Sequence, residues 1–456
     1  MPRRGPVPTI SLLVFALGLS LAQCSIPSGD GIDDEASLLA PPDLDMTLPP
    51  AAVTATPYAL PPDDGASWKV WGGPNRNFTS SASGLAETWP AEGPPMRWSR
   101  PLGDGRSAIA VETGVLYTMY HSGTEEVAVA LNADDGTTKW ESHYEPSFVF
   151  DSLNDPAGPG PYVMPQIVDD LVITAGASGD LRALDKASGE LVWSHSLHSD
   201  FGATRMPYGY TNHPMPYKDL LVLMVGGREG SLMAMKASDG SVVWRRHGFR
   251  NAYSTPVLIN VDGQDQVVAF LSKVIVGFDP NTGELLWQHP HETAFDLAIM
   301  MPVWGEDNLL LYSSADGGGC GVLQLKRVGD YTVAEQMWHS SRIRFHFNSL
   351  IRIGDIVYGS SGKSGATPMT AVNIRSGEIL WQSRAVGKSN LLLGDGRLIV
   401  VDEDGSLGLA NVSPTGLTVT SRARLFGAPA WTVPTLVGTT LYMRGRSDVM
   451  AFDLGR

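Results

Sequence analysis

The sequence predicts an all-β fold, an eight-bladed β-propeller of four-stranded antiparallel blades. A hairpin motif that ends in tryptophan recurs along the chain at intervals of 39 to 53 residues. The stretches between these motifs hold a second pair of short apolar segments, so each repeat supplies four strands, as in a propeller blade. An incomplete repeat near one end of the chain is matched by an unpaired motif segment near the other end.

The recurring motif has a defined turn and a defined apolar position. It reads ALNADDGTTKW at residues 130–140 and ALDKASGELVW at residues 183–193. Asp, Asn, Ser or Pro begins the turn, Gly supplies a positive φ at its end, and the following strand carries the Trp. A Trp at a fixed phase of every repeat predicts packing between neighbouring blades. The motif comprises the tryptophans Trp140, Trp193, Trp244, Trp287 and Trp381, the glycines Gly136, Gly189, Gly240, Gly283 and Gly377 four residues earlier, and the small residues Ala130, Ala183, Ala234, Gly277 and Ala371 ten residues earlier.

The number of blades follows from counting the motif ends. A further unit with a longer turn ends at Trp338, and a seventh ends at Thr420 in place of Trp. An eighth unit, residues 431–454, lacks its last strand and its Trp, whereas PPMRWSRPLG with Trp98 precedes the first full unit without a hairpin partner. We therefore expect the segment around Trp98 to be the outer strand of the eighth blade, which closes the ring and leaves no open edge.

The first 67 residues predict export and a spacer. Residues 1–24 carry Arg3 and Arg4 before a 13-residue apolar run, ISLLVFALGLSLA, which is short for a membrane span and typical of a signal peptide. Two cleavage patterns stay open, one ending at Ala22 and one in which LAQC makes Cys24 a lipidated N-terminus. Residues 25–67, rich in Pro, Asp and Ala, are predicted to be a disordered tether, and residues 68–456 the propeller.

Composition excludes several classes of partner. The chain has 456 residues, of which 43% are hydrophobic, and its net charge of −15 disfavours nucleic acid and anionic lipid. Two cysteines are too few for a disulfide framework. Contact with a membrane is expected only through a lipid on Cys24, and we expect a monomer.

The motif A-L-D-x-x-[ST]-G-x-x-x-W resembles the repeat of quinoprotein-like propellers, those related to dehydrogenases that use pyrroloquinoline quinone (PQQ). Residues 68–456 are similar to an exported bacterial subfamily of PQQ-binding-like proteins and, more distantly, to the propeller lipoprotein of the outer-membrane barrel-assembly machinery. The resemblance to the dehydrogenases would imply PQQ with calcium, held beside two adjacent cysteines by a Glu, an Asn and an Asp, with an Asp as base. The chain has no Cys-Cys pair, because Cys24 and Cys320 stand apart, and no stretch matches the calcium ligands. No cofactor residue is therefore assigned.

Polar and aromatic residues recur at the start of the first strand of each repeat, the strand that lines the channel of a propeller. Because these positions converge on one mouth of the channel, they predict a binding site for a protein partner or a small molecule. The alternative is that they cap channel waters and strand ends. No nucleophile–base pair and no metal-ligand spacing is recognisable. The channel-mouth candidates are Tyr253, Ser254, Asp296, His346, Asn348, Lys388 and Trp431, with Ser107, His213 and Ser389 at like positions.

Two functions of different classes follow. The first is a binding or assembly scaffold that is exported and tethered to the membrane, with a ligand- or partner-binding channel mouth. The second is a PQQ-dependent oxidoreductase with divergent cofactor ligands. The sequence predicts no catalytic residue, so catalysis rests on the resemblance alone.

Overall fold

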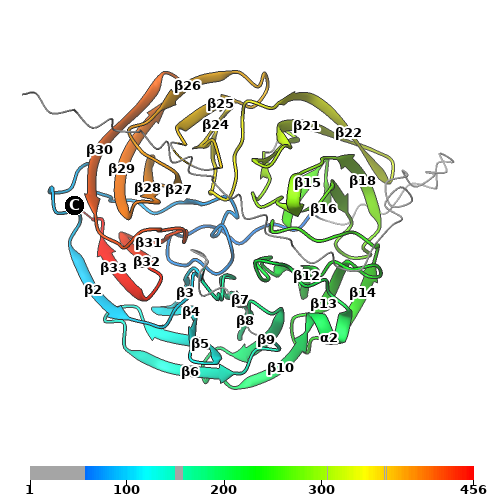
Figure 1. Ribbon diagram of the computed structural model, residues 1–456, viewed down its shortest axis with the longest axis horizontal. Helices are drawn as coiled ribbons and strands as arrows, with labels where there is room; N and C mark the ends of the chain where they lie inside the picture. The colour runs from blue at the N-terminus through cyan, green and yellow to red at the C-terminus, as the bar shows by residue number, and fades with distance from the viewer. Residues whose placement is uncertain (1–56, 149–157, 306, 364, 366, 456) are drawn as a thin grey trace, which may run out of the picture. The chain divides into compact units, whose positions relative to one another are not determined.

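The computed structural model describes residues 57–148, 158–305, 307–363, 365 and 367–455. The predicted signal peptide 1–24, Cys24 and residues 25–56 of the predicted tether lie outside these residues. Eight sheets are arranged in a ring, seven of four strands and one with a fifth strand added to its four, which confirms the eight-bladed propeller (Figure 1). No helix among the described residues is long and apolar enough to cross a bilayer.

Blades 1 to 7 each run from an inner strand to an outer strand in chain order. Blade 1 comprises β3 (Ala110–Glu112), β4 (Val115–Ser122), β5 (Glu125–Asn132) and β6 (Thr138–Tyr144), and blade 2 comprises β7 (Gln166–Val168), β8 (Leu171–Ala175), β9 (Asp180–Asp185) and β10 (Leu191–Ser196). Blade 3 comprises β11 (Met215–Tyr217), β12 (Leu220–Met224), β13 (Leu232–Lys236) and β14 (Val242–Arg246), and blade 4 comprises β15 (Val257–Val261), β16 (Gln264–Phe270), β17 (Val274–Phe278) and β18 (Leu285–Pro290). Blade 5 comprises β19 (Val303–Trp304), β20 (Leu309–Ser314), β21 (Gly319–Val328) and β22 (Tyr331–Ser340). Blade 6 comprises β23 (Ile351–Ile353), β24 (Ile356–Ser360), β25 (Met369–Asn373) and β26 (Ile379–Ser383). Blade 7 comprises β27 (Ser389–Gly394), β28 (Arg397–Asp402), β29 (Ser406–Ser413) and β30 (Gly416–Arg424). Short helices α2 (Leu197–Phe201) and η1 (Ala294–Asp296) lie in connections after blades 2 and 4.

The eighth blade is built from both ends of the described chain. Its strands β31 (Thr435–Val437), β32 (Thr440–Arg444) and β33 (Asp448–Asp453) are completed by β2 (Met96–Pro101), which pairs antiparallel with β33. Met96 lies opposite Phe452 and Trp98 opposite Ala451. The predicted closure of the ring by the Trp98 segment is therefore confirmed.

The motif tryptophans join each blade to the next one. Except for Trp287, the indole N–H of each donates to a backbone carbonyl in the turn of the following blade, for example from Trp140 to Lys186 at 3.0 Å and from Trp193 to Ala237 at 2.8 Å. Trp98, Trp244, Trp338 and Trp381 make equivalent bonds of 2.7 to 3.0 Å. Since each bond links two sheets, the repeat encodes the ring rather than the single blade.

The glycine of the motif is required by this joint. Gly189 has a φ of 76°, and a Cβ there would lie 2.5 Å from the indole of Trp140 in the preceding blade. A Cβ on Gly283 would likewise lie 2.5 Å from the indole of Trp244. The small residue ten positions before the Trp is its cross-strand neighbour, as Ala183 is for Trp193, because the indole lies across that position.

The joint between blades 4 and 5 departs from the rule, because blade 5 has the longer hairpin β21–β22. Trp287 donates instead to the side-chain oxygen of Gln266 in its own blade at 2.8 Å, and Gln266 donates to Thr332 of blade 5 at 2.6 Å. At the cross-strand position a Cβ on Gly277 would lie 1.9 Å from the Trp287 indole nitrogen, which explains glycine in place of alanine.

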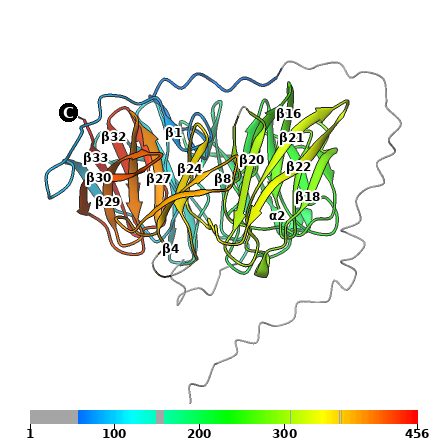
Figure 2. The same ribbon diagram turned by 90° about the horizontal axis from the view of Figure 1, so that it is seen from above.

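Residues 57–95 form an N-terminal strap that runs over one face of the propeller and then along the outer strand β30, where the Trp89 N–H donates to Ser421 at 2.6 Å (Figure 2). This strap face is the one with the turns between the first and second strands of each blade. The strap includes β1 (Thr79–Ser80), a fifth strand added in parallel to the inner edge of β27. Residues 57–67, the only described part of the predicted tether, already contact blades: the Tyr58 N–H donates to Asp265 at 2.7 Å, and the Gly65 carbonyl accepts from Gly438 at 2.7 Å.

Candidate functional site

A cavity of about 1200 Å³ occupies the channel of the propeller. Residues from the strap and from blades 1 to 6 and 8 line it. Its volume exceeds the roughly 300–1000 Å³ that is usual for a site holding one drug-sized ligand. The cavity reaches from the strap face to the opposite end, the connection face, where the chain enters the inner strand of each blade.

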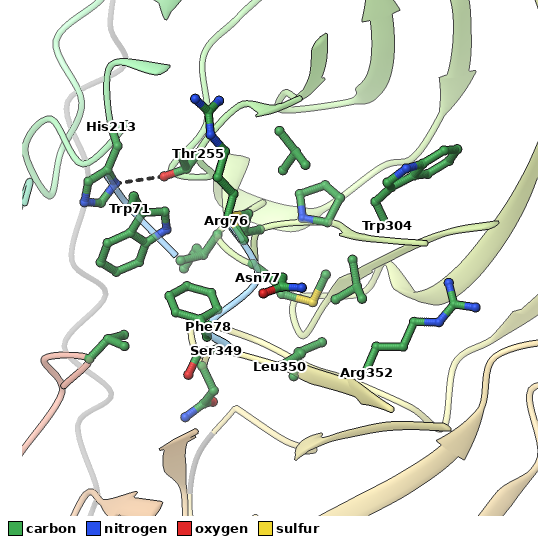
Figure 3. A pocket seen from close by; sticks show the side chains of 18 of the residues that line it. Trp71, Arg76, Asn77, Phe78, His213, Thr255, Trp304, Ser349, Leu350 and Arg352 are labelled. Atoms are coloured by element: carbon green, nitrogen blue, oxygen red, sulfur yellow. Dashed lines mark hydrogen bonds between the residues drawn. The ribbon is translucent and has the colours of Figure 1, made fainter. Parts of the chain in front are cut away.

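The strap fills part of the strap face with aromatic side chains (Figure 3). Trp71 stacks on the imidazole of His213, with ring centroids 4.0 Å apart, and meets Phe78 edge to face at 5.3 Å. His213 accepts from the Met164 N–H at 3.0 Å and lies 2.9 Å from the Thr255 hydroxyl. Burial lowers the pKa of His213 to about 3, so the imidazole is neutral and its role here is structural.

Arg76 is a cavity-lining cation supplied by the strap. Its Nη2 donates to the Pro216 carbonyl of blade 3 at 2.7 Å, and burial lowers its pKa. The guanidinium thus fastens the strap to an inner strand through a backbone carbonyl.

The connection face carries a polar cluster on blades 5 and 6. Asp316 pairs with Lys363, and its second oxygen lies 3.9 Å from the Nε2 of His346. Burial lowers the pKa of His346 to about 4, so the imidazole is neutral at pH 7. Asn348, two residues later, donates to the Ser389 carbonyl at 2.8 Å.

Cations and aromatic rings alternate beside this cluster, where the Phe347 ring lies 5.0 Å from that of His346. The Lys388 ammonium lies 3.4 Å from the centre of the Phe347 ring, and the Arg106 guanidinium lies 4.7 Å from that of Trp431. Phe347 and Trp431 meet edge to face at 5.5 Å. The Trp431 indole donates to Glu403 at 2.5 Å. Burial lowers the pKa of Lys388, which Glu403 at 3.8 Å counteracts.

The structure separates the predicted channel-mouth residues into two groups. Tyr253, His346, Asn348 and Trp431 line the cavity, and Lys388 contacts its aromatic lining. Ser254 instead donates to the Met300 carbonyl at 2.9 Å and does not line the cavity. Asp296, in the connection after blade 4, pairs with Arg250 at 2.6 Å and is likewise not part of the lining. Ligand binding by the first group stays a prediction.

Sequence reasoning missed the strap residues and the opening they leave. Trp68 and Trp71 lie outside the repeat, and this pair of unassigned tryptophans was the available signal. On the strap face the cavity is also lined by Trp304, Arg352 and Arg375 of blades 5 and 6, which no motif identified.

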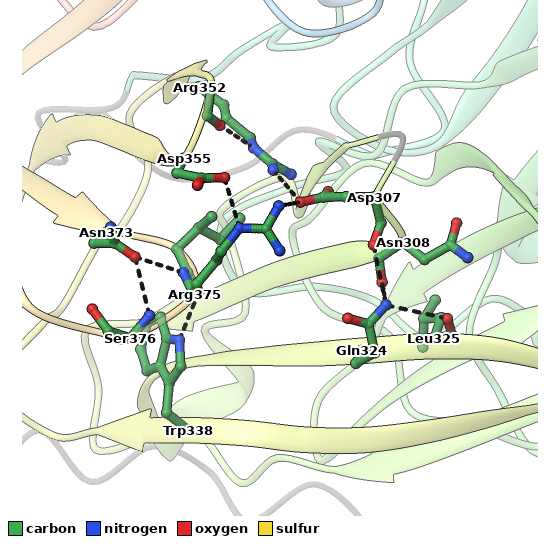
Figure 4. Close-up of polar contacts among 12 residues, drawn as sticks. Asp307, Asn308, Gln324, Leu325, Trp338, Arg352, Asp355, Asn373, Arg375 and Ser376 are labelled. Atoms are coloured by element: carbon green, nitrogen blue, oxygen red, sulfur yellow. Dashed lines mark hydrogen bonds and ion pairs between the residues drawn. The ribbon is translucent and has the colours of Figure 1, made fainter.

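The rim of blades 5 and 6 is held by an ion-pair network (Figure 4). Asp307 accepts from Arg352 at 2.8 Å and from Arg375 at 2.7 Å, and Arg375 also pairs with Asp355 at 2.9 Å. The two guanidinium groups lower the pKa of Asp307 against the opposing effect of burial. This network rigidifies the rim and balances its charge.

No residue set in the described part of the chain is assigned to the quinone or its calcium ion. Across the described ranges, no group of three or more His, Cys, Asp or Glu side chains is arranged to hold a metal. Cys320 is buried and free, and burial raises the pKa of its thiol. We therefore derive no step through PQQ.

Residues 64–207 and 209–433 match the family model described as outer membrane protein assembly factor BamB. The chain belongs to this family. It is 21% identical to a protein named outer membrane protein assembly factor BamB from Yersinia pestis, over 63% of this chain and 73% of that protein. It is 22% identical to the protein of the same name from Burkholderia pseudomallei, over 61% of this chain and 80% of that protein.

Solved structures share the fold at low identity. BamB from Moraxella catarrhalis is 19% identical with a TM-score of 0.58, and the match covers 78% of this chain and 98% of that one. A quinohemoprotein alcohol dehydrogenase from Comamonas testosteroni is 13% identical with a TM-score of 0.60, over 86% of this chain and 81% of that one. This fold carries both assembly factors and dehydrogenases, so the fold does not choose between them.

Proposed function

We propose that this chain is an exported scaffold of outer-membrane protein assembly, tethered to the membrane through Cys24, that binds a partner protein across the channel of its propeller. The match to the BamB family over most of the chain is the observation that carries the proposal. The cavity supports it, because its two mouths present aromatic and charged side chains from many blades without a recognisable catalytic pair.

The geometry of the connection face favours binding over chemistry. His346 is neutral and buried beside Asp316, whose other oxygen is committed to Lys363. A general base needs a reachable proton and a pKa near the operating pH, and this imidazole has neither a hydroxyl nor a thiol partner among the described residues.

The test uses the full chain carrying a C-terminal affinity tag, expressed in a Gram-negative bacterium. We expect mass analysis of the mature protein to find a lipid on Cys24, and the tagged protein to fractionate with the outer membrane. Crosslinking before purification is expected to capture an outer-membrane assembly protein. The Cys24→Ser variant is the matched control, because it should release the protein into the periplasm without changing its fold.

Two results would overturn the proposal. One is a mature N-terminus without lipid on a protein that stays in the cytoplasm. The other is turnover of an alcohol or a sugar by the purified protein after addition of PQQ, Ca²⁺ and an artificial electron acceptor, which would establish the oxidoreductase instead.

A further inference from the structure

We infer that the strap-face opening of the channel binds an extended polypeptide segment of a partner protein, through backbone hydrogen bonds to the inner edges of blades 4 and 6. The inference deepens the proposed scaffold function and rests on it for the identity of the partner. Four observations carry it.

The first observation is that the strap uses one backbone position repeatedly. In blades 1, 2 and 7 the next-to-last residue of the inner strand pairs with the strap: Val111 donates to Trp68 at 2.9 Å, Ile167 to Lys69 at 2.9 Å, and Leu393 to Phe78 at 2.9 Å. In blade 3 this position is Pro216, which has no N–H, and its carbonyl accepts from Arg76.

The second observation is a geometric reason for this choice. A two-residue turn follows the inner strand, so the strand's last residue bonds to the second strand of the blade, as Ile353 does opposite Ile356. The backbone N–H and C=O of the preceding residue then point to the other side, into the channel. These groups form an edge that can accept another strand, as β27 accepts β1.

The third observation is that blades 4 and 6 keep this edge open. The equivalent residues are Asn260 and Arg352, which both line the cavity. Within the described residues the strap makes no hydrogen bond to either backbone. Blade 5, which lies between them, has an inner strand of only two residues, Val303–Trp304.

The fourth observation is the character of the floor between these edges. Leu258, Met301, Pro302 and Trp304 line it. The Asp307–Arg352–Arg375 network forms its rim (Figure 4). An extended segment places alternate side chains on one face, so apolar residues at every second position would pack on this floor. Main-chain bonds would supply affinity independent of the other side chains.

The probe is a fluorescent ten-residue peptide of alternating valine and threonine. Its matched control is the same peptide N-methylated at every second residue, which removes hydrogen-bond donors on one edge and keeps composition and length. We expect fluorescence anisotropy to show binding of the first peptide to the full chain, and at least tenfold weaker binding of the second.

Two variants locate the site. Arg352→Pro removes the inner-edge N–H of blade 6, and Pro216 shows that the propeller accepts proline at this position. Arg352→Leu removes the guanidinium but keeps the backbone N–H. Because both variants lack the guanidinium, they differ at the backbone N–H, and we expect Arg352→Pro to bind the peptide at least tenfold more weakly than Arg352→Leu, with circular dichroism unchanged in both.

Equal binding of the two peptides, no binding of either, or full binding by Arg352→Pro would overturn the inference. So would a concentration-dependent dimer in sedimentation velocity that the peptide dissociates, because the occupant would then be a second copy of this chain. Capture of an assembly protein without peptide binding would leave the proposed function intact and remove only this inference. Peptide binding without lipidation of Cys24 and without capture of an assembly protein would leave this inference intact and remove the proposed function.

Discussion

The contact between the turn glycine and the preceding tryptophan can be measured with two glycines of one blade. Gly283 has a φ of 73°, and a Cβ there would lie 2.5 Å from the indole of Trp244. Gly263 has a φ of 86° with no atom within 4 Å of such a Cβ. Both Ala variants bear the backbone cost of a left-handed residue, about 1–2 kcal/mol. Only Gly283→Ala adds overpacking against the indole, about 1–3 kcal/mol.

We therefore expect Gly283→Ala to lower the free energy of unfolding by about 2–5 kcal/mol and Gly263→Ala by about 1–2 kcal/mol, from the same two costs. Urea unfolding followed by tryptophan fluorescence and by far-UV circular dichroism gives the difference where the two transitions coincide.

A double-mutant cycle tests whether the larger loss of stability in Gly283→Ala comes from contact with the indole of Trp244. Trp244→Leu shortens the side chain that the new methyl group meets, so the second substitution should cost less in its presence. Equal losses for Gly283→Ala and Gly263→Ala, or strict additivity with Trp244→Leu, would refute the reasoning that the motif glycine is selected by the joint between blades.

Three further predictions concern the blade interior, the strap and the irregular joint. Glu126 is buried, accepts from the Tyr144 hydroxyl, and has its pKa raised by burial to about 7 from an ordinary 4.5. Its contribution to stability is therefore full below about pH 4.5 and is lost as pH rises through about 7, which changes the free energy of unfolding by about 3 kcal/mol. Glu126→Gln should flatten the dependence of the urea midpoint on pH between pH 5 and 8. An unchanged slope of the urea midpoint against pH would contradict this prediction. Trp71→Ala removes the stack on His213 and should accelerate tryptic cleavage at Arg76 while the far-UV spectrum stays unchanged; unchanged cleavage would show that the hydrogen bonds alone hold the strap. Thr332→Val removes the acceptor of Gln266 and should destabilise the protein by about 1 kcal/mol, whereas the exposed Thr415→Val should stay within about 0.5 kcal/mol of the parent in the same urea titration.

The ring could be predicted from the sequence because its joints repeat. Five turn glycines meet the tryptophan of the preceding blade by one geometric rule, so a single chain supplies several copies of the same signal. The closure was predictable for the same reason: Trp98 makes the bond to Ala133 that Trp140 makes to Lys186. Register and blade order follow from the positions of the tryptophans.

The course of the strap could not be predicted in this way. Its bonds to Val111, Ile167 and Leu393 are made by backbone groups, which leave no mark on the choice of side chain. Only some of the predicted channel-mouth residues line the cavity, and binding by them stays a prediction. His346 and Trp431 line the cavity because they enter inner strands, whereas Asp296 turns toward Arg250 in a connection whose conformation the repeat does not determine.

Three departures from the repeat lie in blades 4 to 6, whereas Thr420 in place of the motif Trp is a departure in blade 7. The joint between blades 4 and 5 replaces the Trp–carbonyl bond with the relay from Trp287 through Gln266 to Thr332. Blade 5 has the shortest inner strand of the blades described, and blade 6 keeps an inner edge that the strap leaves unbonded. Such local conflicts with a global rule are typical of functional sites, where binding rather than packing determines the residues. The opening above blades 4 to 6 is therefore the part of this propeller whose variants separate binding from stability most cleanly.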